Sequence, residues 1–367
     1  MAVKKTDSRI DTMSGKEAAE QMEYQHGGDV YTYEGMIDFS VNINPLGPGS
    51  FVIQAARNAV ERMTQYPDAG CRCLRRALAE ALQMDEDFFI FGNGGAELIF
   101  NLAAAERPKK AVLLAPSFAE YRQALQAAGC EIIWYPLKES EEFELGEAYL
   151  EYLKEDVDMV FLCSPGNPVG NIIRMELLSK ILERCRKRQI RMVMDECFYE
   201  FLDSWQEHTL QQKAAEYPNL FILRAFTKMY AMPGLRLGYG ICSDAGLIRK
   251  MEGMRQPWSV SVVAQEAGAA AVGDVLHPVR TREYIRRERN WLVGQLDEIG
   301  VRYFTPAANY IFVRSEFDLC EELKKCGILI RDCSNYEGLG KGYYRFAVKK
   351  RQENQRLVEE LRRIYGI

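Results

Sequence analysis

The chain has 367 residues, of which 47% are hydrophobic, 27% charged and 11% aromatic, which excludes a globally disordered or fibrous protein. The 47 Lys and Arg stand against 52 Asp and Glu, and the net charge of -5 indicates neither a nucleic-acid partner nor an anionic membrane. No run approaches the roughly 20 apolar residues that span a bilayer. Residues 1–20 lack the apolar stretch of a signal peptide, so we expect a cytoplasmic protein.

The cysteines and histidines favour neither disulfides nor a metal site. Most of the ten cysteines, such as Cys130 and Cys163, lie in apolar segments, and a chain of this length does not need disulfides to fold. Cys71 and Cys73 are the one close pair, and the three histidines do not supply the usual zinc-binding partners. We therefore expect reduced thiols and no metal.

Short apolar runs alternate with helical patterns along the chain, which is typical of an α/β sheet with crossover helices. In chain order the patterns predict strand 111–115, helix 119–128, strands 131–135 and 158–163, helix 177–187, and strands 190–194, 219–223 and 237–242. After Pro278 they predict a charged helix 280–299, short strands 310–313 and 343–348, and a helix 352–364. We expect a large domain at 49–275 and a smaller one at 276–367, completed by an N-terminal arm at 1–48.

Polar side chains follow three of the predicted strands. Asp195 ends one strand, Asn167 lies just past another, and Lys228 comes five residues after Leu223. Ligands of open α/β sheets collect beyond the carboxyl ends of the strands. A single charged residue at a strand end is usually an ordinary loop residue, so the combination carries the argument.

The combination suits pyridoxal phosphate. A lysine amine condenses with an aldehyde to form a Schiff base, and a buried carboxylate keeps a pyridine nitrogen protonated. Residues 92–97, Gly-Asn-Gly-Gly-Ala-Glu, precede a helical run and offer backbone donors to a phosphate. Arg236, eight residues after Lys228, adds a fixed cation. An ordinary tight turn is the alternative interpretation of the glycine run.

Five motifs resemble, in the same order, those of fold-type I pyridoxal phosphate enzymes of the class I/II aminotransferase superfamily. They are QYPDAG (65–70), GNGGAE (92–97), SPGNPVG (164–170), MDECFYEF (194–201) and TKMYAMPGLRLGY (227–239). The branch shared by threonine-phosphate decarboxylases and histidinol-phosphate aminotransferases is the most similar. The resemblance implies an aspartate aminotransferase type of fold, in which a mostly parallel sheet lies between helices and a smaller α+β domain follows. It also implies a homodimer with shared active sites.

The resemblance assigns roles to individual residues. Lys228 is the Schiff-base lysine, Asp195 is the partner of the pyridine nitrogen, Asn167 donates to the ring oxygen, and Phe118 covers one face of the ring. The residues implied to bind the phosphate are Gly94, Gly95, Ala96, Thr227, Arg236 and, from the second subunit, Tyr66.

The N-terminal and C-terminal motifs resemble the threonine-phosphate decarboxylase branch of cobalamin biosynthesis. They include HGGD (26–29), DFSVNINPLG (38–47), QPWSV (256–260), ILIRDCSNY (328–336) and YYRFAV (343–348). The resemblance implies decarboxylation of L-threonine O-3-phosphate to (R)-1-amino-2-propanol O-2-phosphate. His26 and Asn42 would face the substrate phosphate, and Arg331 and Arg345, beside Asn167, would hold the carboxylate. In the alternative interpretation, His26 is an ordinary residue of the N-terminal arm without a role in substrate binding.

Other functions stay open or are disfavoured. An aminotransferase similar to histidinol-phosphate aminotransferase would use the same residues, so the motifs do not choose between the two reactions. A nicotinamide-dependent dehydrogenase needs GxGxxG after a strand, and residues 234–240 and 338–342 have the wrong spacing. A non-catalytic module would most simply have lost Lys228 or Asp195. Phe198 and Ala225 depart from the family pattern, in which Tyr and a hydroxyl residue are common.

Overall fold

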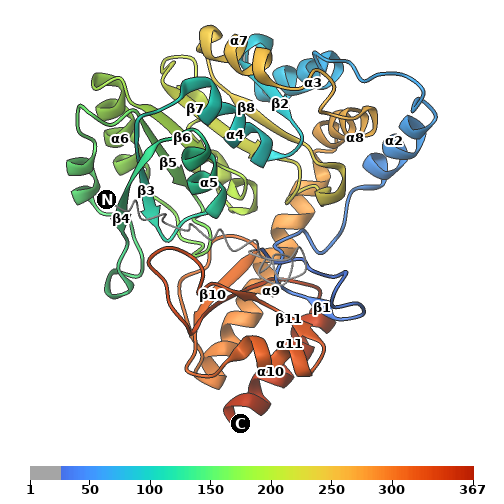
Figure 1. Ribbon diagram of the computed structural model, residues 1–367. Helices are drawn as coiled ribbons and strands as arrows, with labels where there is room; N and C mark the ends of the chain where they lie inside the picture. Colours follow the sequence, from blue (N-terminus) through green and yellow to red (C-terminus); the bar gives the residue numbers. More distant parts are fainter. Residues whose placement is uncertain (1–25) are drawn as a thin grey trace, which may run out of the picture.

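A seven-stranded sheet forms the frame of the larger part of the molecule in the computed structural model, which describes residues 26–367 (Figure 1). The strand order is β2-β8-β7-β6-β5-β3-β4. Among the described strands of this sheet, β8 alone runs antiparallel to the other six. The strands are β2 (Phe89–Gly92), β3 (Lys110–Ala115), β4 (Glu131–Pro136), β5 (Met159–Cys163), β6 (Arg191–Asp195), β7 (Leu220–Ala225) and β8 (Gly238–Ile241).

Helices cover both faces of this sheet. Four central strands, β3, β5, β6 and β7, are almost wholly buried runs of apolar residues, as strands covered on both faces must be. Side chains of α4 (Gly95–Glu106), α5 (Ala119–Ala127) and α7 (Ala245–Met254) pack on one face. Those of α3 (Arg72–Leu82), α6 (Met175–Lys187) and α8 (Val262–Gly273) pack on the other. Helix α2 (Ser50–Val60) lies outside, against α8.

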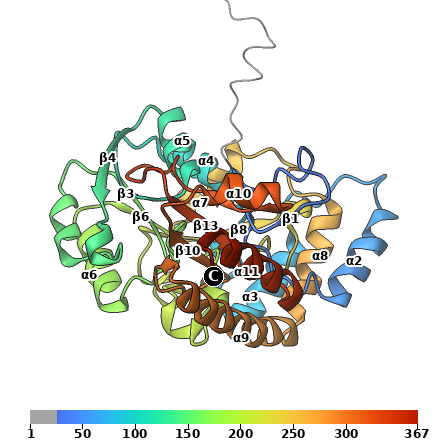
Figure 2. The ribbon, with the colours of Figure 1, turned by 90° about the horizontal axis from the view of Figure 1, so that it is seen from below.

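The smaller part is built on an antiparallel sheet with the order β12-β13-β10-β9. Its strands are β9 (Arg302–Tyr303), β10 (Tyr310–Arg314), β12 (Arg331–Asp332) and β13 (Tyr343–Ala347). Helix α9 (Leu276–Ile299) links the two parts and, with α10 (Leu319–Lys325) and α11 (Arg351–Tyr365), covers this sheet (Figure 2). Strand β1 (Ile37–Asp38) pairs with β11 (Ile328–Leu329), so residues 37–38 join the smaller part.

The expected fold is confirmed, with differences at element boundaries. Helix α9 begins at Leu276 rather than at residue 280, because Pro278 is tolerated in the first turn, where its missing N–H has no helical partner. The sequence did not predict β2, whose four residues are all buried. The first 25 residues of the expected arm lie outside the described residues. Within residues 26–367, no helix combines the length and the apolar character needed to cross a bilayer.

Candidate active site

The start of helix α4 forms a cradle for an anion. Gly94 precedes the helix with φ +83° and offers no capping side chain, so the amides of the first turn stay available as donors. A Cβ on Gly94 would lie 2.6 Å from Nη2 of Arg236, and one on Gly238 would lie 2.5 Å from N of Gly95. Both glycines are therefore required for the close approach of the α4 amides, β8 and the Arg236 guanidinium.

Asp195 is a buried carboxylate at the end of β6. Its Oδ2 accepts a hydrogen bond of 2.6 Å from Oη of Tyr121, and its Oδ1 accepts one of 2.9 Å from N of Cys197. Burial raises the pKa of Asp195, whereas the hydrogen bonds from Tyr121 and Cys197 oppose the rise. No salt bridge joins Asp195 to a cation within residues 26–367. A ligand nitrogen that carries a proton would supply the missing positive partner.

Lys228 lies three residues beyond the end of β7. Burial, and then the charge of Arg345, lowers its pKa to about 8, so about a tenth of the amine is unprotonated at pH 7, far more than for an ordinary lysine. Its Nζ lies 5.8 Å from the centre of the Phe198 ring, and among the described side chains none forms a hydrogen bond with it. A partly deprotonated amine without a fixed partner is suited to attack an aldehyde.

Asn167 presents its amide nitrogen to the site. Its Oδ1 accepts hydrogen bonds from Nη1 of Arg345 and, at 3.3 Å, from Oη of Tyr336. Because the oxygen is occupied by these two donors, the NH₂ group is left to donate. The contacts join a loop of the large part to β13 and to residue 336 of the smaller part.

Arg331 and Arg345 are direct cross-strand partners in the β12–β13 pair. Both are buried, and like charges opposite each other destabilise a sheet. Arg331 donates to Oδ1 of Asn335 at 2.9 Å, and Nη2 of Arg345 donates to O of Ser40 at 3.2 Å. Both acceptors of Arg345, Oδ1 of Asn167 and O of Ser40, are uncharged, so an anionic ligand suits its guanidinium.

His26 lies at the edge of the same group. Its Nε2 is 3.4 Å from Oε1 of Glu120, near the start of α5. Burial, followed by the nearby charge of Arg331, lowers the pKa of His26. Asn42 is also buried, and its Oδ1 has no hydrogen-bond partner among the described residues. Its backbone oxygen accepts from Asn309 at 3.0 Å.

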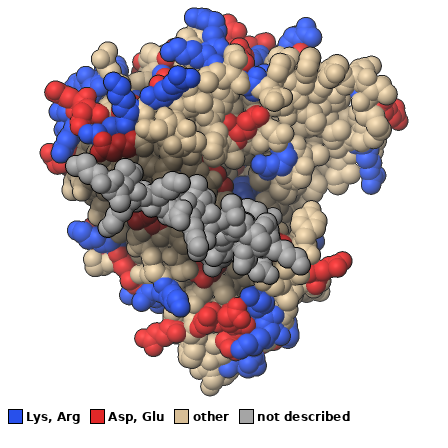
Figure 3. Space-filling model, viewed as in Figure 1, with Lys and Arg blue, Asp and Glu red and all other residues tan. Residues whose placement is uncertain are grey.

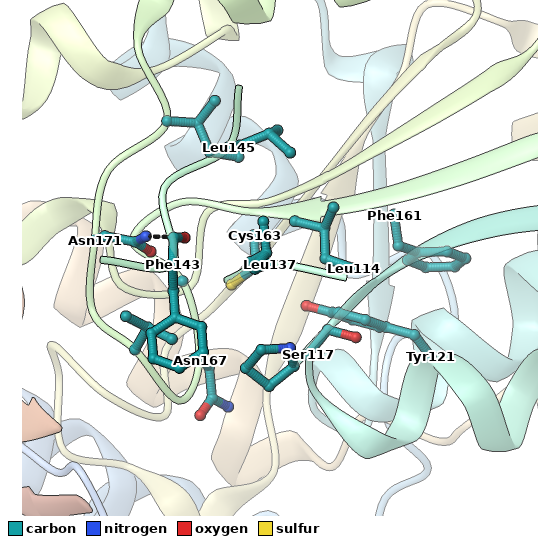
Figure 4. A pocket seen from close by; sticks show the side chains of 14 residues that line it. Leu114, Ser117, Tyr121, Leu137, Phe143, Leu145, Phe161, Cys163, Asn167 and Asn171 are labelled. Carbon is teal, nitrogen blue, oxygen red and sulfur yellow. Dashed lines mark hydrogen bonds between the residues drawn. The ribbon is translucent and has the colours of Figure 1, made fainter. Parts of the chain in front are cut away.

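A cavity lies behind Asn167, between the ends of β3 and β5 (Figure 4). The Tyr121 hydroxyl, Ser117 and the Asn167 amide lie toward one side of it, and Leu145 lies on the opposite side. Oγ of Ser117 is buried without a partner in the part of the chain that the structure describes. Phe118, the residue expected to cover the cofactor ring, directly precedes α5. The centre of its ring lies 5.6 Å from that of Tyr121 in an edge-to-face arrangement.

The structure thus gathers most of the predicted residues at the strand ends. Thr227 directly precedes Lys228, and Gly94, Gly95 and Ala96 form the start of α4 beside Arg236. Tyr66 differs, because its side chain is exposed and its ring stacks on Trp258 at 4.4 Å. Sequence reasoning missed Tyr121 and Glu120, although both stand in the same segment as Phe118.

Comparisons with known proteins identify the family of this chain. The family model for aminotransferase class I and II matches residues 34–361. A threonine-phosphate decarboxylase from Salmonella typhimurium is 36% identical over 92% of this chain and 96% of its own length. A histidinol-phosphate aminotransferase from Symbiobacterium thermophilum is 33% identical over 90% of this chain and 91% of its own length.

Solved structures extend the similarity to three dimensions. The crystal structure of the histidinol-phosphate aminotransferase from Clostridium acetobutylicum superimposes with a TM-score of 0.85 at 28% identity, covering 90% of this chain and 99% of that one. The family depends on pyridoxal phosphate, and the α4 cradle, the cation-free Asp195 and the amine of Lys228 fit that cofactor. The chain belongs to the class I and II aminotransferase family of fold-type I pyridoxal phosphate enzymes.

Proposed function

We propose that Lys228 carries pyridoxal phosphate and that Asp195 pairs with the protonated ring nitrogen. Gly94, Gly95, Ala96, Thr227 and Arg236 would hold the phosphate, Asn167 would donate to the ring oxygen, and Phe118 would cover the ring. When bound, the cofactor supplies the electron-withdrawing ring that weakens one bond at the α-carbon of the substrate. The polar atoms described above support this arrangement.

We further propose that the protein decarboxylates L-threonine O-3-phosphate to (R)-1-amino-2-propanol O-2-phosphate. The observation that carries this proposal is the buried, mutually opposed pair Arg331 and Arg345, with His26 beside Arg331. Arg331 and Arg345 would hold the substrate carboxylate, and His26 with Asn42 would face its phosphate ester. The likeness to the decarboxylase from Salmonella typhimurium supports the same substrate.

The protein's task in this reaction is to orient the substrate. With the cofactor bound, the bond that breaks at the α-carbon would depend on how the residues of this chain orient the substrate. Arg345 is fixed by Asn167 and by O of Ser40, so a carboxylate bound to its free edge has a defined direction. Arg345 would thereby present this carboxylate group for loss as carbon dioxide. Lys228 would then deliver a proton to the α-carbon.

An aminotransferase acting on a phosphorylated amino compound is the second candidate. The structural match to the histidinol-phosphate aminotransferase from Clostridium acetobutylicum favours it, and the same lysine could move a proton between two carbons. The test is to incubate the cofactor-loaded protein with threonine phosphate and to measure carbon dioxide release. A parallel reaction measures glutamate formed from 2-oxoglutarate. Carbon dioxide without glutamate supports the decarboxylase, and the reverse result overturns it.

We also propose a homodimer in which Tyr66 reaches the neighbouring active site. An area with few charged side chains lies over α2 and α8 (Figure 3). Phe51, Met63 and Tyr66 are each at least 70% exposed, and Trp258 is 51% exposed. Large apolar side chains exposed together suit burial against a second copy. Light scattering of the purified protein tests this proposal, and a monomer at micromolar concentration would overturn it.

A further inference from the structure

Glu120 carries a mostly buried carboxyl group that the proposed chemistry does not yet use. It lies in the first turn of α5, and its side chain is 14% exposed. Oε1 lies 3.4 Å from Nε2 of His26, whereas Oε2 is buried and has no hydrogen-bond partner in residues 26–367. A buried carboxyl oxygen left without a partner is costly, which indicates that a ligand completes its environment.

Charged groups from four other segments face Glu120. His26 comes from the segment before β1, Asp195 from β6, Lys228 from the turn after β7, and Arg331 from β12. Burial raises the pKa of Glu120 to about 7, while a hydrogen bond from its own backbone amide and the charges of Lys228 and Arg331 lower it, and Asp195 raises it. Near neutral pH the group is therefore present in both its neutral and its charged form.

The two forms would act in opposite ways on an anion beside Arg331. A charged Glu120 would repel the anion and compete with it for the guanidinium. A neutral carboxyl group can donate one hydrogen bond, and an anionic oxygen is the strongest acceptor available to it. His26, whose pKa is lowered, contributes little positive charge above neutral pH, so the donated hydrogen bond matters more there.

We propose that Glu120, in its protonated form, is a substrate-binding residue that donates a hydrogen bond from Oε2 to the anionic group held beside His26 and Arg331. This inference rests on the proposed function for its choice of a phosphorylated substrate. It adds a neutral acid to the site, so that the affinity for the anionic group depends on the protonation of Glu120. Phosphorylated substrates would then bind more weakly in alkaline solution.

The experiment measures sulfate binding to the cofactor-loaded protein by titration calorimetry. Sulfate keeps its double charge across the pH range used, and the bound cofactor blocks the α4 cradle. If only the neutral form binds, the dissociation constant rises by about tenfold between about pH 7.5 and about pH 8.5. In Glu120→Gln, which keeps a donor and does not titrate, the rise should shrink to less than about twofold.

Two further variants complete the test. Glu359→Gln removes an exposed carboxyl group of α11 and should keep the wild-type rise. Glu120→Met keeps the length without a donor and should bind sulfate about tenfold more weakly at about pH 6.5. The cofactor absorbance and the melting temperature of each variant establish that it is folded.

Three outcomes would overturn the inference: an equal rise in Glu120→Gln and wild type, a flat profile in wild type, or no sulfate binding at all. None of these results depends on turnover. A protein that releases no carbon dioxide from threonine phosphate but shows the expected sulfate profiles would refute the proposed function and leave this anion site intact.

Discussion

Asp195 and Glu196 are neighbours in the sequence but lie on opposite faces of the large sheet. Glu196 accepts hydrogen bonds from Nε and Nη2 of Arg224 at 3.0 and 2.7 Å, and also from Thr209 and from N of Leu210. The side chains of this ion pair are 2% and 0% exposed. Asp195 has hydrogen bonds but no salt bridge among the described residues. The buried charge of Glu196 is thus paired with a cation, whereas that of Asp195 has no such partner among the described residues. This difference distinguishes the structural face of the sheet from the face that we assign to catalysis.

The sharpest test of this contrast is Lys228→Ala, with Lys228→Arg as the matched control. Neither variant can form the covalent bond to the cofactor, although arginine keeps the positive charge. We expect turnover to fall by at least about a thousandfold in both. Borohydride reduction followed by mass spectrometry should find the cofactor attached to wild type alone. A Lys228→Arg enzyme with a tenth of the wild-type rate would refute the assignment.

Glu196→Gln should damage the structural face. It leaves the Arg224 guanidinium buried without an anionic partner, which we expect to lower the free energy of unfolding by about 3–5 kcal/mol. Urea denaturation of the cofactor-free protein measures the loss, and turnover per folded molecule should change little. The double variant Glu196→Met/Arg224→Met removes both charges and should lose less. A loss below about 1 kcal/mol in the single variant would contradict this view of the ion pair.

Asp195→Asn should give the opposite pattern. Turnover should fall by about a hundredfold, because the ring nitrogen loses its acidic partner. Burial raises the pKa of Asp195 above its unfolded value, so its ionisation destabilises the folded cofactor-free protein as the pH rises above that unfolded value. Asparagine removes this penalty, and melting temperatures at acidic and neutral pH should show a variant at least as stable as wild type at neutral pH. Marked destabilisation of Asp195→Asn at neutral pH would contradict the contrast that we draw between Asp195 and Glu196.

Arg345→Lys should have the smallest effect. Lysine keeps the charge but cannot contact Asn167, Ser40 and a carboxylate with one planar group. We expect KM for threonine phosphate to rise by about tenfold, which corresponds to about 1.4 kcal/mol. Arg314→Lys makes the same exchange on β10, where the side chain is 41% exposed, and should leave the kinetics unchanged. Equal kinetic changes in the two variants would remove Arg345 from the proposed site.

The sequence predicted the strand ends well, because apolar runs locate buried strands and the residues after them share one edge of the sheet. Asp195, Asn167 and Lys228 could be found in this way. Strand β2 was missed because four consecutive apolar or glycine residues have no period of their own. The start of α9 was misplaced because a proline pattern suggests a boundary even where the first turn accepts it.

Contacts between distant segments could not be predicted from the sequence. The Arg331–Arg345 pairing depends on the register of β12 and β13, and the approach of His26 to Glu120 depends on how the segment before β1 meets the start of α5. Tyr121 was overlooked because a buried tyrosine in a helix usually fills a core. Its hydrogen bond to Asp195 becomes apparent only once α5 has been packed against β6.

Gly238 has a consequence for the evolution and redesign of this scaffold. It lies in β8, and a methyl group there would collide with the backbone of Gly94 and Gly95. Libraries of variants with substitutions in the smaller sheet could be screened for new substrates while Gly238 is kept unchanged. Substrate specificity could therefore change in evolution or design while cofactor binding is kept.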